Sequence, residues 1–294
     1  MAAQQNQAGL RATAIAFPGT EASGTAWDLY NQMIAGIPEG VLVRDYCLGL
    51  NWSYVEADCG MGVAFTVRGG GKRTYKMDLR GMELRQVAEL SKSWCFQEAT
   101  LGIAALNAWY SRRELLAPLG CEFADPAEHH GEDEPGGNGR KDAFCAYKPQ
   151  IAAKGDANVV VVGHFPNVAD IAEYANLTVL ERNCRDGLDT PDPGCEYVMP
   201  QADYAFITGV TLINKTAPRL LDLTKNATTV FVGPSVVMTP FLFDWGVEML
   251  AGSIVGDVEK LRFAVKNGAG QLFGEALQMA SLTAHRRGTH TRSM

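Results

Sequence analysis

The sequence predicts an α+β domain followed by an α/β domain with an open parallel sheet. Three observations predict this fold class. The chain of 294 residues is long enough for two compact domains, because single cores usually stop growing near roughly 250 to 300 residues. Its first half groups strand-like segments before helix-like ones, whereas its second half alternates the two. We expect the first domain over residues 25–117, an acidic linker or insertion over residues 118–140, and the second domain over residues 141–284.

The first domain begins with a predicted helix. Apolar residues recur at helical spacing from Trp27 to Ile37, and Pro38 follows, so we expect the helix to end near Gly36. Four segments then have the composition of strands in an antiparallel meander: 41–50, 52–57, 62–67 and 74–77. Two helices follow, over residues 83–90 and 95–110, the second of them rich in Ala and Leu.

The second domain alternates strands and helices. Residues 157–162 form a short β-branched run, typical of a strand that is covered on both faces in a parallel sheet. The loop at 163–166 follows this strand, and after it we expect a helical stretch that ends at Tyr174. Further strands are expected over residues 177–180, 204–207 and 229–232, with helices over 212–223 and 242–254. Right-handed crossovers between such units produce an open parallel, Rossmann-like sheet.

Composition excludes several classes of partner. The net charge of −7 argues against nucleic-acid binding, because phosphates are bound by clustered Lys and Arg side chains. No apolar run approaches the roughly 20 residues that cross a bilayer, and the N-terminal stretch lacks the apolar core of a signal peptide. We therefore expect a cytoplasmic protein without nucleic-acid or membrane partners. The seven cysteines are scattered without a C-x-x-C pair, which favours reduced packing residues.

The predicted parallel sheet suggests where a ligand would bind. Ligands of such sheets bind beyond the carboxyl ends of the strands, where helix N-termini and free backbone N–H groups converge. Four loops lie at predicted strand ends, and three of them combine glycine or proline with polar side chains, so together they could hold an anion or a polar small molecule. The candidate ligand-binding residues in these loops are Gly163, His164, Phe165, Pro166, Glu181, Thr208, Gly209, Thr211, Asn214, Gly233, Pro234 and Ser235.

His164 is the histidine that lies within a structured motif, and its near-neutral pKa range suits either metal ligation or proton transfer. A local hydrogen bond is the alternative. Cys184 and Cys195 flank the loop D-G-L-D-T-P-D-P-G at 186–194, which could offer sulfur and carboxylate ligands to a soft metal, although ordinary loop cysteines explain them better. The G-x-G-x-x-G fingerprint is absent after the first strand, which disfavours NAD, and no catalytic motif defines a reaction.

Four segments together resemble one known family: C-F-Q-E-A-T-L-G-I-A-A-L-N-A at 95–108, V-V-G-H-F-P at 161–166, A-D-Y-A-F-I-T-G-V-T-L-I-N-K-T at 202–216 and V-G-P-S at 232–235. The chain is similar to the putative heavy-metal chelation family, and the similarity covers nearly all of it apart from the tails and the acidic insertion. The resemblance implies an enolase N-terminal-like domain joined to a Rossmann-like domain. It also implies a ligand site in the cleft between them, facing the helix that carries Glu98 and Asn107.

Three hypotheses of function follow. In the first, the protein binds or delivers a transition or heavy metal ion, either bare or as a complex with a small organic ligand, through His164. In the second, it is a Rossmann-type enzyme that acts on a small anionic or nucleotide-like substrate, with His164 or Glu98 moving a proton. In the third, it is a noncatalytic interaction module. The sequence leaves the identity of the metal and a homo-oligomeric state open.

Overall fold

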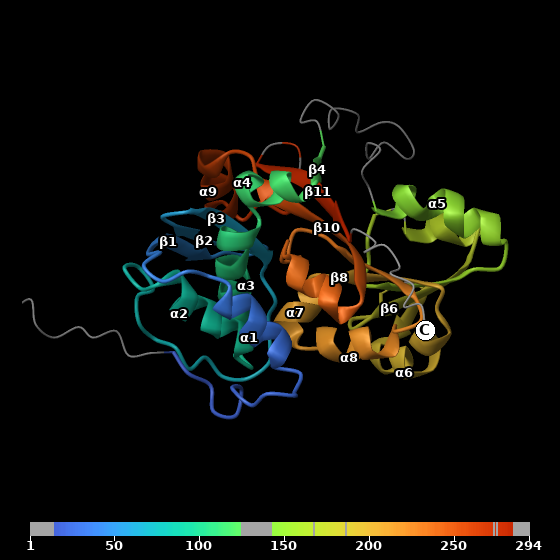
Figure 1. Ribbon diagram of the computed structural model, residues 1–294, viewed down its shortest axis with the longest axis horizontal. Coiled ribbons are helices and arrows are strands. Elements are labelled where there is room, and N and C mark those ends of the chain that lie inside the picture. The colour runs from blue at the N-terminus through green and yellow to red at the C-terminus, as the bar shows by residue number, and fades with distance from the viewer. Residues whose placement is uncertain are drawn as a thin grey trace, which may run out of the picture.

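The computed structural model describes residues 15–124, 143–166, 168–185, 187–272, 274 and 276–284. It is a mixed α/β structure with two sheets, a small antiparallel one and a large, mostly parallel one, which lie side by side (Figure 1). Residues 125–140 of the predicted acidic segment lie outside the described part of the chain. Among the described residues, no helix is long and apolar enough to cross a membrane.

The small sheet consists of three consecutive antiparallel strands, β1 (Val43–Leu48), β2 (Trp52–Ala57) and β3 (Gly60–Phe65). Helix α3 (Phe96–Tyr110) packs against β3 and β2 and is buried over almost its entire length. Gly62 permits this close approach, because a Cβ atom there would lie 2.0 Å from the backbone nitrogen of Ala108. The predicted Ala-rich helix is therefore the centre of the first half of the fold.

Most predicted elements of the first half are confirmed. Helix α1 (Asp28–Ala35) ends before Gly36, and α2 (Leu84–Ala88) continues into a 3₁₀ turn. The predicted strand over residues 74–77 is wrong, because this segment is a loop. The backbone N–H groups of Thr74 and Tyr75 donate to the carboxylate of Glu98, whereas in a strand they would pair with a neighbouring strand.

The large sheet contains eight strands in the order β4-β11-β10-β9-β8-β5-β6-β7. The six strands from β10 to β7 are parallel, while β11 and β4 add an antiparallel edge. Counted along the chain, the six parallel strands have the order 3-2-1-4-5-6 of a doubly wound sheet, which reverses between β5 and β8. The strands are β4 (Glu122–Phe123), β5 (Asn158–Val162), β6 (Asn176–Glu181), β7 (Asp189–Pro191), β8 (Tyr204–Thr208), β9 (Thr228–Val232), β10 (Val247–Val255) and β11 (Leu277–Thr283).

Two helix predictions in the second half are corrected. Residues 242–254 are not a helix, because a 3₁₀ turn ends at Gly246 in a left-handed conformation (φ +88°) and β10 begins. In β10, Gly252 packs against Met238, and β9 and β11 flank the strand. The predicted helix over 212–223 is divided into α7 (Val210–Asn214) and α8 (Ala217–Leu223) at Lys215, whose φ is +71°.

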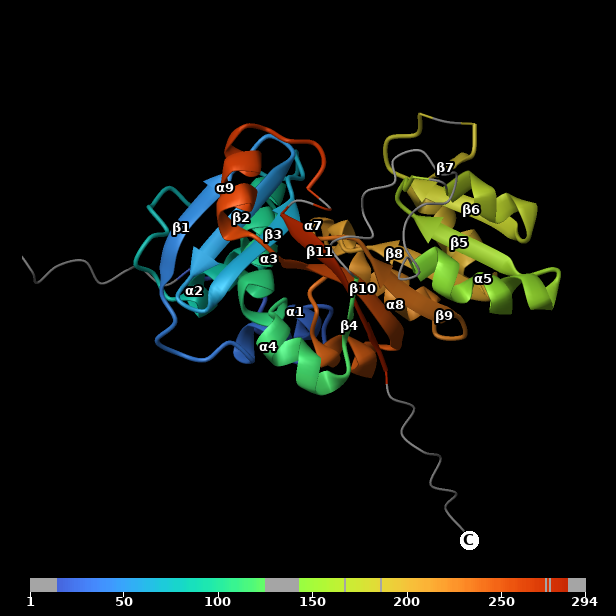
Figure 2. The ribbon, with the colours of Figure 1, turned by 90° about the horizontal axis from the view of Figure 1, so that it is seen from above.

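Helix α9 (Val258–Lys266) and the strand β11 were not predicted. α9 comes from the C-terminal half of the chain, yet it packs against the small sheet at the N-terminal half (Figure 2). Its buried residues Leu261 and Val265 cluster with Tyr54 and Val63, on the face of the small sheet opposite the one that α3 covers. The two halves of the chain therefore share a hydrophobic core.

The remaining helical elements are short apart from α5, which precedes the first strand of the large sheet. They are α4 (Arg113–Leu116), α5 (Ala143–Lys154), α6 (Cys195–Val198) and the 3₁₀ turns Glu89–Lys92, Ala117–Leu119, Val168–Glu173, Asp192–Gly194, Met199–Gln201 and Pro240–Trp245.

Candidate functional site

A cleft of about 1130 Å³ opens at the carboxyl ends of β5, β6, β8 and β9. It includes the point between β5 and β8 where the strand order reverses, which is where doubly wound sheets bind ligands. Residues 50–52 and 65–68, at the edge of the small sheet, form the facing wall. The predicted residues that line this cleft are Gly163, His164, Phe165, Pro166, Glu181, Thr208, Thr211, Asn214, Gly233, Pro234 and Ser235.

Three predicted residues lie outside the lining: Glu98, Asn107 and Gly209. The side chain of Glu98 is buried and accepts hydrogen bonds from Ser93 Oγ and, at 3.0 Å, from Thr74 Oγ1, in addition to two backbone N–H groups. Its carboxylate is therefore saturated by protein donors, and it holds the loop at residues 74–75 in place.

Asn107 connects the two walls of the cleft through hydrogen bonds. Its amide Nδ2 donates to the carbonyl of Val63 at 2.9 Å and to that of Pro234 at 3.4 Å. Beside it, Ser235 Oγ accepts a hydrogen bond from the backbone N–H of Phe65 at 2.9 Å. These bonds attach the loop after β9 to strand β3, so they set the width of the cleft at this point.

Glycines shape the loops that line the cleft. Gly163 and Gly233 have φ of +100° and +101°, a conformation that other residues rarely adopt. At Gly209, a Cβ atom would lie 2.3 Å from the backbone nitrogen of Val236. Gly209 therefore contributes by allowing the loops after β8 and β9 to pack directly against each other.

Several polar side chains of the lining already have partners within their own loops. Thr211 Oγ1 donates to the carbonyl of Thr208 at 2.7 Å. Asn214 Oδ1 accepts hydrogen bonds from the backbone N–H and the hydroxyl of Thr216, at 3.1 and 2.6 Å. Glu181 Oε1 accepts from the backbone N–H of Asn183 at 3.0 Å. These contacts stabilise the loops' conformations.

His164 pairs with Asp189, one of the acids of the loop at 186–194 that the sequence suggested as a source of carboxylate ligands, but the pairing itself was not predicted. The ring Nδ1 lies 3.1 Å from Asp189 Oδ1, and the side chain of His164 is 44% exposed while that of Asp189 is 1% exposed. The backbone N–H of Arg185 donates to the second carboxylate oxygen of Asp189 at 2.8 Å. An ionised carboxylate accepts from Nδ1–H, which leaves Nε2 as the basic nitrogen of a neutral imidazole.

The pairing was not predicted because β7, the three-residue strand that carries Asp189, has no sequence periodicity. The contact of His164 with a residue 25 positions away depends on β5, β6 and β7 lying side by side in the sheet.

The described residues contain no group of three or more His, Cys, Asp or Glu side chains placed to hold a metal ion. Of the two cysteines considered as metal ligands, Cys195 lines the cleft. Cys184 does not line it, and its thiol donates to the carbonyl of Glu181 at 3.4 Å. A bare ion bound only by protein side chains commonly has three or four such ligands. The described residues do not provide that set.

Aromatic rings line both walls of the cleft. Trp52 and Phe65 meet edge to face on the small-sheet wall, with their ring centroids 5.3 Å apart, and the indole N–H of Trp52 donates to the carbonyl of Gly270. Phe165 lies on the strand-end wall and packs against Phe144. The cleft can therefore hold the apolar body of an organic molecule.

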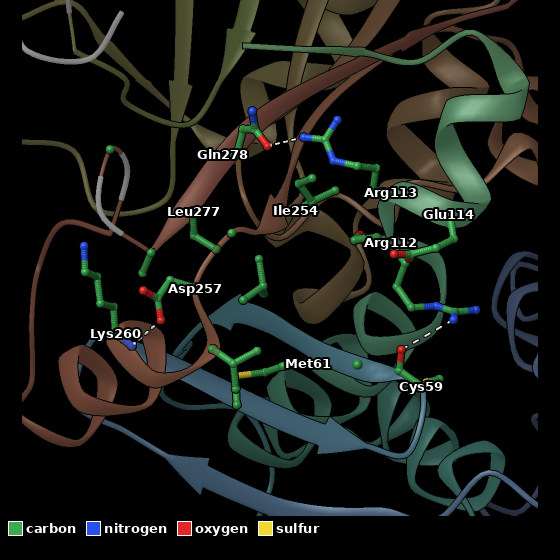
Figure 3. A pocket seen from close by; sticks show the side chains of 17 residues that line it. Cys59, Met61, Arg112, Arg113, Glu114, Ile254, Asp257, Lys260, Leu277 and Gln278 are labelled. Atoms are coloured by element: carbon green, nitrogen blue, oxygen red, sulfur yellow. Dashed lines mark hydrogen bonds between the residues drawn. The ribbon is translucent and has the colours of Figure 1, made fainter. Parts of the chain in front are cut away.

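A second, smaller pocket of about 550 Å³ lies where α4, α9 and β11 meet (Figure 3). Arg112, Arg113, Lys260 and Asp257 stand around an apolar floor that includes Ile254. Asp257 caps α9 by accepting from the backbone N–H of Lys260, and Arg113 donates to Gln278. No predicted site residue lines this pocket, so the larger cleft is the candidate site.

Comparison with known proteins supports the sequence resemblance. Two family models, both described as putative heavy-metal chelation, match residues 148–279 and 30–110. A crystal structure from Desulfitobacterium hafniense, titled as a DUF364 family protein of unknown function, is 30% identical to this chain. The match covers 88% of this chain and 99% of that one, with a TM-score of 0.74. The chain belongs to the DUF364 family.

Two further proteins are similar to this DUF364 chain. An uncharacterized protein of Methanocaldococcus jannaschii is 29% identical over 243 residues, which are 78% of this chain and 84% of that protein. A DUF364 protein of unknown function from Pyrococcus horikoshii has the same fold, with a TM-score of 0.69 at 20% identity, over 87% of this chain and 98% of that one.

Proposed function

We propose that this DUF364 protein binds a metal ion in complex with a small organic ligand, in the cleft at the strand ends, with His164 as the coordinating side chain. The observation that carries this proposal is the His164–Asp189 pair on the wall of a large cleft. Such carboxylate–histidine pairs orient the imidazole of metal ligands. The family description of heavy-metal chelation supports the same conclusion.

A complex fits the cleft better than a bare ion does. The described residues lack a cluster of three metal-binding side chains, and a volume of about 1130 Å³ is far more than an ion requires. An organic chelator would fill this space and supply most of the donor atoms, while Nε2 of His164 occupies one coordination position. We therefore propose that the metal is cargo, brought and held by its ligand.

The experiment that tests this proposal measures metal retention. We expect untagged protein incubated with Ni²⁺ and an organic chelator to retain nickel through gel filtration, with the nickel quantified by mass spectrometry. His164→Ala should lower the retained nickel at least about tenfold, and Asp189→Asn should lower it by about tenfold, because orienting partners of ligands typically contribute that much. Asp170→Asn, at an exposed position outside the cleft, is the matched control.

Equal nickel retention by wild type and His164→Ala would contradict the proposal. Asp189→Asn separates coordination from a general loss of folding, since its effect should act through the orientation of the imidazole. Circular dichroism of each variant before loading confirms that it is folded.

A second candidate function rests on the same pair. A neutral imidazole oriented by a buried carboxylate is also the arrangement of a general base, which a Rossmann-type enzyme acting on a small anionic or nucleotide-like substrate would need. A thermal-shift screen of nucleotides, S-adenosylmethionine and phosphorylated metabolites tests this function. Stabilisation that disappears in His164→Ala would favour it, and uniformly null shifts would count against it.

We further propose that residues 25–117 and 141–284 are the two domains, enolase N-terminal-like and Rossmann-like, with the cleft between them. The separate small sheet and the doubly wound strand order support this division. Helix α9 modifies it, because it extends from the second domain onto the small sheet.

A further inference from the structure

We infer that the organic ligand of the cleft is a multiply charged anion, held from the two facing walls by Arg68 and Arg185. This inference rests on the proposed function and specifies the chemical class of its ligand. Arg68 follows strand β3 on the small-sheet wall, and Arg185 follows strand β6 on the strand-end wall. Both residues are exposed and line the cleft.

Of the described residues, four arginines line the cleft, and two of these already have carboxylate partners. Arg182 Nε lies 2.8 Å from Asp192 Oδ2. Arg219 pairs with Glu196 and Asp222, both outside the lining. These two guanidinium groups are therefore neutralised by the protein.

The other two arginines have no such compensation. Among the described residues, no carboxylate lies within 4.0 Å of the guanidinium of Arg68 or Arg185. Within the described part of the chain, the side chain of Arg68 donates to the carbonyl of Leu50, at 3.2 Å. A guanidinium that faces a cleft without a carboxylate is suited to binding a carboxylate or phosphate of a ligand.

The two carboxylates of the described lining that are not paired with an arginine, Glu181 and Asp189, form no ion pair with Arg68 or Arg185 either. Asp189 accepts from the ring of His164 and from the backbone N–H of Arg185, and Glu181 accepts from the backbone N–H of Asn183. Both groups are thus engaged in shaping their own loops. Among the described residues of the lining, the guanidinium groups without a carboxylate partner are therefore those of Arg68 and Arg185.

The position of the two arginines on different walls selects for size. A small inorganic anion could neutralise one guanidinium, whereas a ligand with anionic groups at separate points can reach both. Trp52 and Phe65 on one wall and Phe165 on the other offer apolar contact to the body between those groups. This combination describes a polycarboxylate chelator, which carries both the negative charge and the donor atoms that the protein lacks.

The test uses metal-free nitrilotriacetate and citrate, and nitrilotriacetate with one equivalent of Ni²⁺, titrated calorimetrically into untagged full-length protein. Nitrilotriacetate leaves coordination positions of nickel open for an imidazole. We expect Arg68→Gln and Arg185→Gln each to weaken binding of the metal-free anions about tenfold, the loss of one charge-assisted hydrogen bond. Arg44 is an exposed arginine on strand β1 that is paired with Asp58, so Arg44→Gln should bind as wild type does.

The pattern of results separates this inference from the proposed function. His164→Ala should weaken binding of the nickel complex more than binding of the metal-free anions, because only the complex offers a coordination position to Nε2. If neither metal-free anion binds, or if both arginine variants bind as wild type does, the inference is overturned. If the anions bind through the arginines but nickel adds no affinity and His164→Ala has no effect, the inference stands and the proposed metal function fails.

Discussion

His164 and Glu98 have opposite roles because their surroundings differ. The carboxylate of Glu98 is buried and receives hydrogen bonds from two backbone N–H groups and two hydroxyls, which occupy its acceptor sites. His164 is partly exposed and has one ring nitrogen bound to Asp189. A residue whose polar atoms all form hydrogen bonds within the protein, such as Glu98, stabilises the fold. A residue with a polar atom that still faces a cleft, such as His164, can bind a ligand.

Lys215 shows the cost of burying a charge at the residue scale. It stands between α7 and α8 with φ +71°, and its Nζ donates to the carbonyl of Ile213 at 2.6 Å. Desolvation lowers the pKa of Lys215 to about 7. The folded protein therefore prefers the neutral amine at alkaline pH.

Replacing this lysine should change how stability depends on pH. Between pH 7 and the unfolded pKa of about 10.4, the unfolded chain binds the extra proton, so raising the pH should stabilise the wild type relative to Lys215→Met. The slope of the difference should be at most about 1.4 kcal/mol per pH unit. Urea unfolding of both proteins at pH 7, 8 and 9 measures it, and parallel profiles would contradict the lowered pKa.

At the scale of elements, the cleft is built by loops that pack backbone to backbone. The loop after β8 passes so close to the loop after β9 that only glycine fits at position 209. Asn107 and Ser235 then attach the second loop to strand β3. The geometry of the cleft depends on these contacts as much as on the residues that line it.

Gly209→Ala should therefore destabilise the protein and deform the cleft. Its Cβ would lie 2.3 Å from the nitrogen of Val236 and 2.4 Å from the carbonyl carbon of Ser235, neither of which can move without the loop. We expect a loss of about 1–3 kcal/mol in urea unfolding, the usual cost of overpacking. Gly187→Ala, where no atom lies within 4 Å of the new Cβ, is the control and should change stability little. Equal stability of the two variants would show that the loops can separate freely.

At the scale of the whole molecule, the two halves of the chain are interlocked. Helix α9, near the C-terminal end, covers the small sheet, while β4, which follows the first group of helices, joins the edge of the large sheet beside β11. Arg262 on α9 also forms an ion pair with Glu56 on β2 at 2.7 Å. Neither sheet completes its core without residues from the other half.

Leu261→Ala should destabilise the small sheet, although it lies far from that sheet in sequence. Leu261 is fully buried among Tyr54, Met61 and Val63, so we expect a loss of about 2–5 kcal/mol. Hydrogen exchange should show faster exchange of the amides of β2 and β3. Phe263→Ala, on the same helix but 71% exposed, should leave these amides protected and thereby controls for the effect of any substitution in α9. Unchanged β2 and β3 protection in Leu261→Ala would show that the sheet is stable without α9.

The sequence predicted those strands and helices whose own residues form a clear apolar pattern. The apolar β-branched runs predicted β5, β6, β8 and β9, and the Ala-rich segment predicted α3, because elements that are covered on several sides consist mainly of apolar residues. The same reasoning failed for β10, since a run such as V-E-M-L-A-G-S-I-V suits a buried strand and a buried helix equally well. Its neighbours β9 and β11 decided between them.

For the candidate site, the sequence by itself determined which loops would meet, because parallel strands bring their carboxyl ends to one edge of the sheet. Only the tertiary structure decided the roles of individual side chains. It placed Asp189 beside His164, enclosed Glu98 among hydrogen-bond donors, and positioned Arg68 across the cleft from the strand ends. These arrangements bring together residues from different elements. The distances between such residues depend on how the sheets and helices pack, and no local sequence pattern predicts that packing.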